Sequence, residues 1–189
     1  MSALATLNDL RQLLQITDSE DDVLLQRLLD AASAWIGTQC GYGSSGMLSA
    51  EHTFTFSGED TRGWSPPVQP VTAIASVTID GEEIPARDAA NDVDGYYLSN
   101  FGRAELSGAY RFTRGQGNCV VVATCGYASD AVPADLEAAA LALAAQRFQE
   151  RNRIGQVSGN VGGVQVTWST FSAPADVNLT IAAYRLGSI

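Results

Sequence analysis

The spacing of apolar residues changes twice along the chain, and this change sets the fold class. Over the first forty positions apolar residues recur at helical spacing. Between about residues 51 and 125 they alternate with polar residues, and Gly, Pro and Asp separate short segments, which is typical of strands joined by turns. Helical spacing returns at residue 134. The sequence therefore predicts an α+β fold, in which a helical bundle carries an inserted antiparallel β region.

Two helices are predicted in the first part, over residues 7–16 and 19–40. Two residue pairs have the spacing of a capping box, Thr6 with Asp9 and Thr17 with Glu20. Gly41 is a natural C-terminal stop. In the β region, Asp80-Gly81 follows an apolar run and predicts a hairpin.

The last third is predicted to hold a long helix over residues 134–152, which completes a single domain spanning 1–153. Residues 154–189 are predicted to form a flexible docking segment with a short strand and a short terminal helix. Because so short a helix is marginal alone, it needs its own domain or a partner to pack on. Val177, Ile181 and Tyr184 would share one face of it.

The charge of the chain is strongly acidic. Its 189 residues include 21 acidic residues and 11 arginines but no lysine, for a net charge of −10. General DNA binding by phosphate neutralisation is therefore not expected. By segment the net charge is −7 for residues 1–60, −3 for 61–130 and zero for 131–189, so the acidity is N-terminal in sequence. Neither a signal peptide nor a membrane span is predicted.

The sequence offers no catalytic, cofactor or metal site. The single histidine, His52, lies in a Thr/Phe alternation with no nucleophile motif nearby. Cys40, Cys119 and Cys125 lack the spacing of a zinc site and are interpreted as reduced, buried thiols. The stretch 41–46 matches G-x-G-x-x-G, but it follows a helix and precedes strands, so it is interpreted as a helix end and loop.

The arginines near the end of the predicted long helix have two interpretations. Arg147, Arg151 and Arg153 either compensate the helix dipole and pair with Glu150 or with the acidic helices, or they contact another subunit or partner. The sequence leaves both open.

Several local patterns, taken in order, resemble the head-tail connector (adaptor) proteins of tailed bacteriophages. The similar stretches are Leu7-Asn8-Asp9-Leu10, the acidic turn at 18–22, Ala34-Trp35-Ile36 before Cys40-Gly41-Tyr42, Pro70-Val71 with 76–81, Gly126-Tyr127 with 132–136, the alanine-rich helix to 147–151, and Ala183-Tyr184-Arg185. Together they span most of the chain.

The resemblance implies a structural protein and not an enzyme. Such proteins form a ring with the portal's twelvefold symmetry at the capsid vertex, extend the DNA channel and offer a platform for the next head-completion (stopper) or tail protein. The expected partners are copies of the chain, the portal and that next protein, with double-stranded DNA passing through without specific binding and no membrane involved. The expected location is the virion neck, after synthesis in the host cytoplasm.

The C-terminal segment commonly engages the portal in that family. On this basis Trp168, Phe171, Tyr184 and Arg185 are expected to contribute to portal docking, and the three arginines Arg147, Arg151 and Arg153 to a subunit or portal interface. Two alternatives remain, a tail-completion or tail-terminator ring protein and a cell-wall hydrolase that uses a carboxylate pair.

Overall fold

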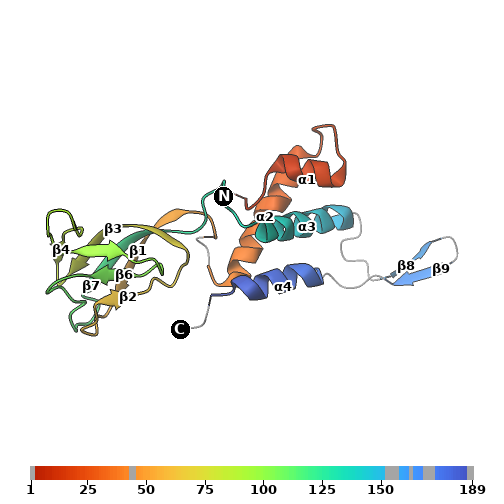
Figure 1. The fold of residues 1–189 in the computed structure, drawn as a ribbon. Coiled ribbons are helices and arrows are strands. Elements are labelled where there is room, and N and C mark those ends of the chain that lie inside the picture. Colours follow the sequence, from red (N-terminus) through yellow and green to blue (C-terminus); the bar gives the residue numbers. More distant parts are fainter. Residues whose placement is uncertain (1–2, 43–45, 152–157, 162–163, 168–172, 187–189) are drawn as a thin grey trace. The chain divides into compact units, whose positions relative to one another are not determined.

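The structure, a computed structural model, describes residues 3–42, 46–151, 158–161, 164–167 and 173–186 (Figure 1). Its contacts divide the chain into two compact units. The helical unit joins Met1–Gly46 to Ala131–Arg185, and the β unit comprises Met47–Asp130. The β unit is inserted between helices of the other unit, so the predicted α+β class is confirmed.

The first helix, α1, spans Leu7–Leu14 and begins where the sequence predicts. The Thr6 hydroxyl accepts a hydrogen bond from the Asp9 amide at 3.2 Å, which satisfies one free N–H of the first turn. Gln15 ends the helix in the left-handed conformation with φ of 57°. The predicted end at residue 16 is therefore two residues too late.

Helix α2 spans Asp22–Cys40 and ends as expected at Gly41, whose φ of 94° suits glycine. Its predicted start at residue 19, with a capping box at Thr17 and Glu20, is wrong. The Asp18 carboxylate instead accepts a hydrogen bond from the Glu20 amide at 3.2 Å, which forms a local turn before the helix.

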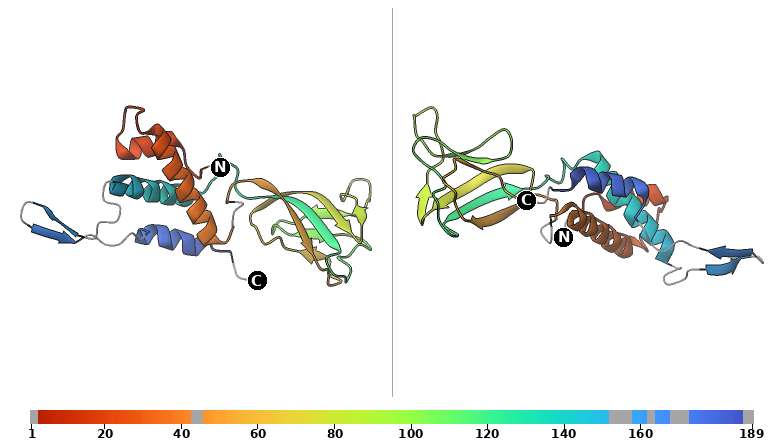
Figure 2. Two further views of the ribbon diagram at one scale, coloured as in Figure 1. Left: turned by 180° about the vertical axis from the view of Figure 1, so that it is seen from behind. Right: turned by 90° about the horizontal axis from the view of Figure 1, so that it is seen from below.

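The third helix, α3, spans Ala134–Glu150, so its predicted end at 152 is also late. The terminal helix α4 spans Ala175–Tyr184. Between them the structure has two antiparallel strands, β8 (Ser158–Val161) and β9 (Val164–Thr167), where one strand was predicted. Figures 1 and 2 show α4 beside α3, with α2 crossing both.

The helical core consists of side chains repeated every three or four residues. In α2 they are Leu25, Leu29, Ala32, Ile36 and Cys40. In α3 they include the residues predicted for its buried face, namely Leu136, Ala140, Leu143, Ala144 and Phe148. The alanines of α3 let neighbouring helices approach closely. No described helix meets the length and apolarity needed to cross a membrane.

The β unit contains two antiparallel sheets. The first has the order β1-β7-β3-β4 and the second the order β2-β6-β5. The bounds of the strands are β1 Ala50–Phe56, β2 Gly63–Trp64, β3 Val71–Ile79, β4 Glu82–Ile84, β5 Tyr96–Leu98, β6 Ala104–Leu106 and β7 Cys119–Cys125. The turn between β3 and β4 is formed by Asp80 and Gly81, both at positive φ, which confirms the predicted hairpin.

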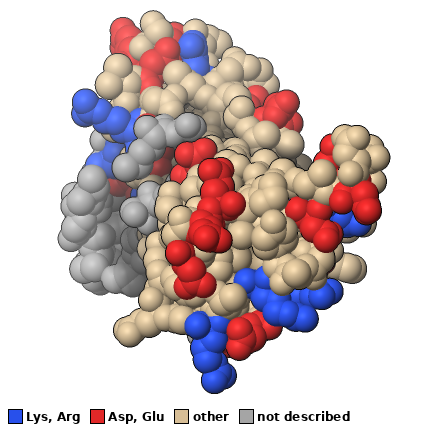
Figure 3. All heavy atoms as spheres, turned by 90° about the vertical axis from the view of Figure 1, so that its left-hand side faces the viewer, with Lys and Arg blue, Asp and Glu red and all other residues tan. Residues whose placement is uncertain are grey.

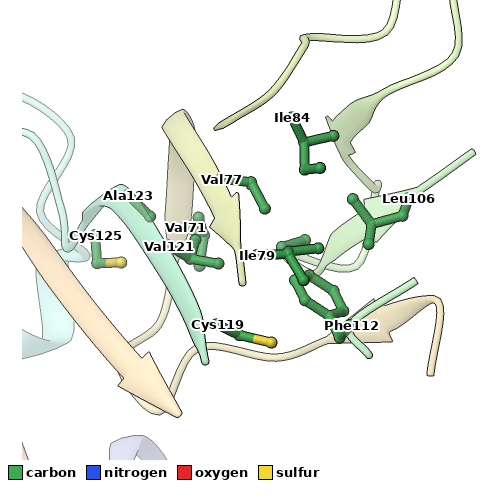
Figure 4. Packing of buried hydrophobic residues seen from close by; sticks show 11 residues of the cluster. Val71, Val77, Ile79, Ile84, Leu106, Phe112, Cys119, Val121, Ala123 and Cys125 are labelled. Carbon is green, nitrogen blue, oxygen red and sulfur yellow. The ribbon is translucent and has the colours of Figure 1, made fainter. Parts of the chain in front are cut away.

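Both sheets contribute to one apolar core (Figure 4). Val77 and Val121 come from the first sheet and Leu106 from the second, and Phe112 is fully buried among them. The Phe56 ring stacks on Trp64 at 4.1 Å between centroids and lies 5.4 Å from Phe112. Aromatic packing of this kind adds to simple area burial.

Candidate interaction site

Helix α4 packs on α2 and α3 through one face. Val177 is fully buried and Ile181 is 7% exposed, as the sequence predicts for that face. The Cys40 sulfur at the end of α2 lies 3.9 Å from the Ile181 carbonyl oxygen. Burial raises the pKa of the Cys40 thiol, and the charge of Arg185 opposes that shift. The C-terminal helix is therefore an integral part of the helical unit.

The two predicted site residues at the end of α4 contact both neighbouring helices. The Tyr184 hydroxyl donates a hydrogen bond to the Asp135 carboxylate at 2.8 Å, in the first turn of α3. The Arg185 guanidinium donates to the Gln39 carbonyl oxygen at 3.4 Å, in the last turn of α2. A cation at a helix C-terminus is favourable because the carbonyls there carry partial negative charge. Both side chains thus hold α4 in place.

Arg151 contacts the acidic start of α2. Its guanidinium lies 3.7 Å from the Phe148 ring centroid, donates to the Phe148 carbonyl oxygen at 2.8 Å and reaches the Asp21 carboxylate at 3.9 Å. Because both partners of the Asp21 pair are partly exposed, the pair contributes well under 1 kcal/mol. Arg151 thus makes the pairing with the acidic helices that one of the two interpretations expects, and its contact with another subunit or partner stays a prediction. Arg147 is half-buried on α3.

The acidic turn before α2 is also partly neutralised from α1. Arg11 lies 3.3 Å from the Asp22 carboxylate and donates to the carbonyl oxygens of Thr17 and Asp18. The N-terminal acids and the C-terminal arginines, far apart in the sequence, therefore belong to one unit.

The predicted site residues do not form a single cluster. Arg151 lies with the first residues of α2, whereas Tyr184 and Arg185 lie at its last turn. A helix of 19 residues is about 28 Å long, so the two groups are at opposite ends of α2. Arg153, Trp168 and Phe171 lie outside the described residues.

Sequence reasoning missed two groups of side-chain contacts. It missed Asp135 as the partner of Tyr184, because the two are 49 positions apart. It also missed a group on the three-stranded sheet, formed by Arg87, Tyr97, Arg103 and Glu105. These residues come from separate short segments, and only the strand register brings them together. The sequence offered only its composition as a signal for this group: arginine is the chain's only strongly basic residue type.

The side chains that could react chemically, the histidine and the three cysteines, are packed among other side chains. His52 stacks on Phe54 at 5.8 Å on β1. The three cysteines are free and buried, and desolvation raises the pKa of each thiol, which disfavours the nucleophilic thiolate. Within the described ranges, no three His, Cys, Asp or Glu residues are placed to hold a metal ion.

Three solved structures share this fold. A chain from the "Neck of native GTA particle computed with C12 symmetry" has a TM-score of 0.63 at 19% identity, covering 97% of this chain and 89% of that one. A chain from the "Neck of empty GTA particle computed with C6 symmetry" has a TM-score of 0.64 at 19% identity, covering 100% and 95%. A third, from the "Virion of native gene transfer agent (GTA) particle", has a TM-score of 0.60 at 18% identity, covering 98% and 91%.

Sequence comparison gives the family. No curated protein sequence matches the chain significantly. The family model described as "Head completion protein" matches residues 3–186, and that description names a structural role and not an enzymatic one. The match confirms the resemblance to head-tail connector proteins that the sequence patterns indicate. Because the match extends over nearly the whole chain, the protein belongs to the head completion protein family.

Proposed function

We propose that the chain forms a ring of identical subunits beneath the portal, at the neck of a tailed phage-like particle. There it extends the DNA channel and provides the attachment platform for the next head-completion or tail protein. The match to the head completion family over residues 3–186 carries this proposal. The shared fold with proteins from particle necks reconstructed with C12 and C6 symmetry supports the ring.

The charge of both units suits a protein through which DNA passes. The helical unit has ten acidic residues and six arginines, a net charge of −4, and the β unit has eleven and five, a net charge of −6. Arginine and lysine contacts to phosphates would hold the duplex, whereas an acidic lining repels it. Either unit could therefore line the channel without retaining DNA.

The C-terminal segment is proposed to dock on the portal. Its helix α4 is apolar on two sides: Val177 and Ile181 are buried within the unit, while Leu179 is 74% exposed and Ala182 and Ala183 are exposed beside it. A helix that is apolar all round is normally buried on all sides. The outer side of α4 is thus the part of the segment that a portal can cover. Trp168, Phe171, Tyr184 and Arg185, with Arg147, Arg151 and Arg153, remain the proposed contact residues.

A deletion of the gene tests the proposed function. Particles made without the protein are expected to package DNA, but to lose it and to lack tails, because the platform for the next protein is missing. Electron microscopy and a nuclease-protection assay measure both properties, with the wild-type gene supplied in trans as the control. Tailed, DNA-filled particles from the deletion strain would overturn the proposal.

A point substitution tests docking separately. Leu179→Asp leaves the buried side of α4 unchanged and is expected to reduce binding to portal-bearing capsids at least tenfold, because it places a charge in an apolar contact. Leu13→Asp, on α1 and 54% exposed, is the matched control. Equal binding by the two variants, or undiminished binding after removal of residues 155–189, would refute docking through this segment.

A further inference from the structure

One face of the three-stranded sheet in the β unit carries arginine and aromatic side chains. Tyr97 of β5 and Gly63 of β2 both pair with Glu105 of β6, so these three positions form one row across the sheet. The Tyr97 hydroxyl donates a hydrogen bond to the Glu105 carboxylate at 2.7 Å. The Arg87 guanidinium lies 5.0 Å from the Tyr97 ring centroid. Such a contact orients the guanidinium without neutralising it.

The glycine in this row leaves space for a second guanidinium. A Cβ atom at Gly63 would lie 3.0 Å from Arg103 Nη2 and 3.6 Å from Glu105 Cγ. Arg103 therefore lies over the backbone of β2, beside Glu105. Two residues earlier, in the turn between β5 and β6, Phe101 is 86% exposed. We call the set Arg62, Arg87, Tyr97, Arg103 and Glu105 the Tyr97 patch; Arg62 belongs to it because its charge opposes the raised pKa of the Tyr97 hydroxyl.

The arginines of the patch have no carboxylate partner in the described structure. The ion pairs Arg11–Asp22 and Arg151–Asp21, each within 4.0 Å, both lie in the helical unit. Arg62 donates instead to the Gly108 carbonyl oxygen at 2.9 Å. The β unit nevertheless contains eleven acidic residues. Figure 3 shows acidic side chains spread over much of one face, with arginine side chains between them. The patch is thus locally positive on an acidic unit.

The composition of the patch fits a protein partner. Arginine and tyrosine are among the residues enriched at protein interfaces, and a guanidinium pairs well with a carboxylate. A phosphate backbone carries charge along its whole length and would also meet the acidic remainder of the unit, whose net charge is −6, whereas a short acidic loop need meet only the patch. An acidic protein surface that brings its own carboxylates to Arg62, Arg87 and Arg103 is the complementary occupant.

A second copy of this chain offers such a surface. The loop between α1 and α2, with the first residue of α2, has four carboxylates in five residues, and two of them, Asp18 and Glu20, are exposed and outside the ion pairs of Asp21 and Asp22. A ring of identical subunits requires two different surfaces that meet head to tail. We propose that the Tyr97 patch of one subunit binds the acidic α1–α2 loop of its neighbour, an inference that rests on the proposed ring.

Charge exchange tests this contact in assembled particles. R87E/R103E and, separately, D18R/E20R are expected to lower the number of copies per particle at least tenfold, because each places like charges opposite one another. The quadruple variant R87E/R103E/D18R/E20R reverses the charges on both sides of every contact in a homo-oligomer. It is expected to recover incorporation to within about threefold of wild type. R111E/R114E changes the charge of the β unit equally, at exposed arginines outside the patch, and is expected to assemble normally.

A cross-link gives an independent readout. Because Cys40, Cys119 and Cys125 are buried, R103C with E20C introduces the only exposed thiols among the described residues. Mild oxidation of particles is expected to yield a series of covalent multimers, absent from either single variant. Absence of the wild-type chain from tailed particles would overturn the ring itself. Two outcomes would overturn only the contact and leave the ring. One is incorporation of R87E/R103E at the wild-type level. The other is failure of the quadruple variant to recover incorporation, which would point to a nucleic acid on the patch.

Discussion

Docking of α4 on the helical unit can be measured at Cys40. Ile181 is 7% exposed, so Ile181→Ala removes three carbons that are almost wholly buried. At about 0.8 kcal/mol for each buried carbon, with some collapse of the cavity, the cost is about 2–3 kcal/mol. Since each 1.4 kcal/mol is tenfold in an equilibrium constant, the open population of α4 should rise about 30- to 150-fold. Leu179→Ala, at 74% exposure, should change it by less than about threefold.

The assay is alkylation of the cysteines, followed by mass spectrometry. Cys40 is buried and lies against the Ile181 carbonyl, so departure of α4 is expected to expose it, and its labelling rate reports the open population. Cys119 and Cys125 belong to the β unit and serve as internal standards. The milder Ile181→Val should raise labelling of Cys40 about fourfold. Equal Cys40 rates in Ile181→Ala and Leu179→Ala, or a parallel rise at Cys119 and Cys125, would refute this description of α4.

Three further predictions use the same structure. Tyr184→Phe removes the hydrogen bond to Asp135 and costs about 1 kcal/mol, so Cys40 labelling should rise about fivefold; an unchanged rate would show that the bond does not hold α4. Phe112→Ala should destabilise the β unit by about 3–5 kcal/mol in a denaturant titration while amide exchange in α2 stays as in wild type; equal loss in both units would contradict their independence. Hydrogen bonds from Thr113 and Asn118 lower the pKa of Asp80 below 3.8. The ionised carboxylate therefore stabilises the folded β unit fully above that pH, and this stabilisation is lost as the pH falls through the pKa of the folded state. An NMR titration that finds an ordinary pKa for Asp80, or an acid unfolding transition that Asp80→Asn leaves unaltered, would contradict this prediction.

The sequence predicts the elements well where local signals act alone. Thr6, Gly41 and Asp80-Gly81 set helix ends and a hairpin through short-range backbone chemistry, and each is confirmed. The apolar spacing of α3 identifies its buried face for the same reason. The start of α2 was misplaced because Thr17 and Glu20 have the spacing of one motif, whereas Asp18 forms a competing local turn that the spacing does not reveal.

The contacts between distant segments could not be predicted. The pairing of Arg151 with Asp21 and of Tyr184 with Asp135 depends on how α2, α3 and α4 cross, and no residue pattern encodes it directly. The Tyr97 patch depends on the register of three short strands, of which β2 has only two residues. The division of charge into −7, −3 and zero along the sequence likewise becomes −4 and −6 in the folded units, because the β unit interrupts the helical one.

The central claim is that this head completion protein forms a ring at the neck. A reconstruction of the whole particle, calculated without imposed symmetry and with the chain carrying a small fused label, tests that claim most directly. We expect a closed ring of labelled subunits directly below the portal, with density that fits the helical unit and the β unit each by itself. Label density at the tail side of the next protein, along the tail, or nowhere in the particle would contradict it.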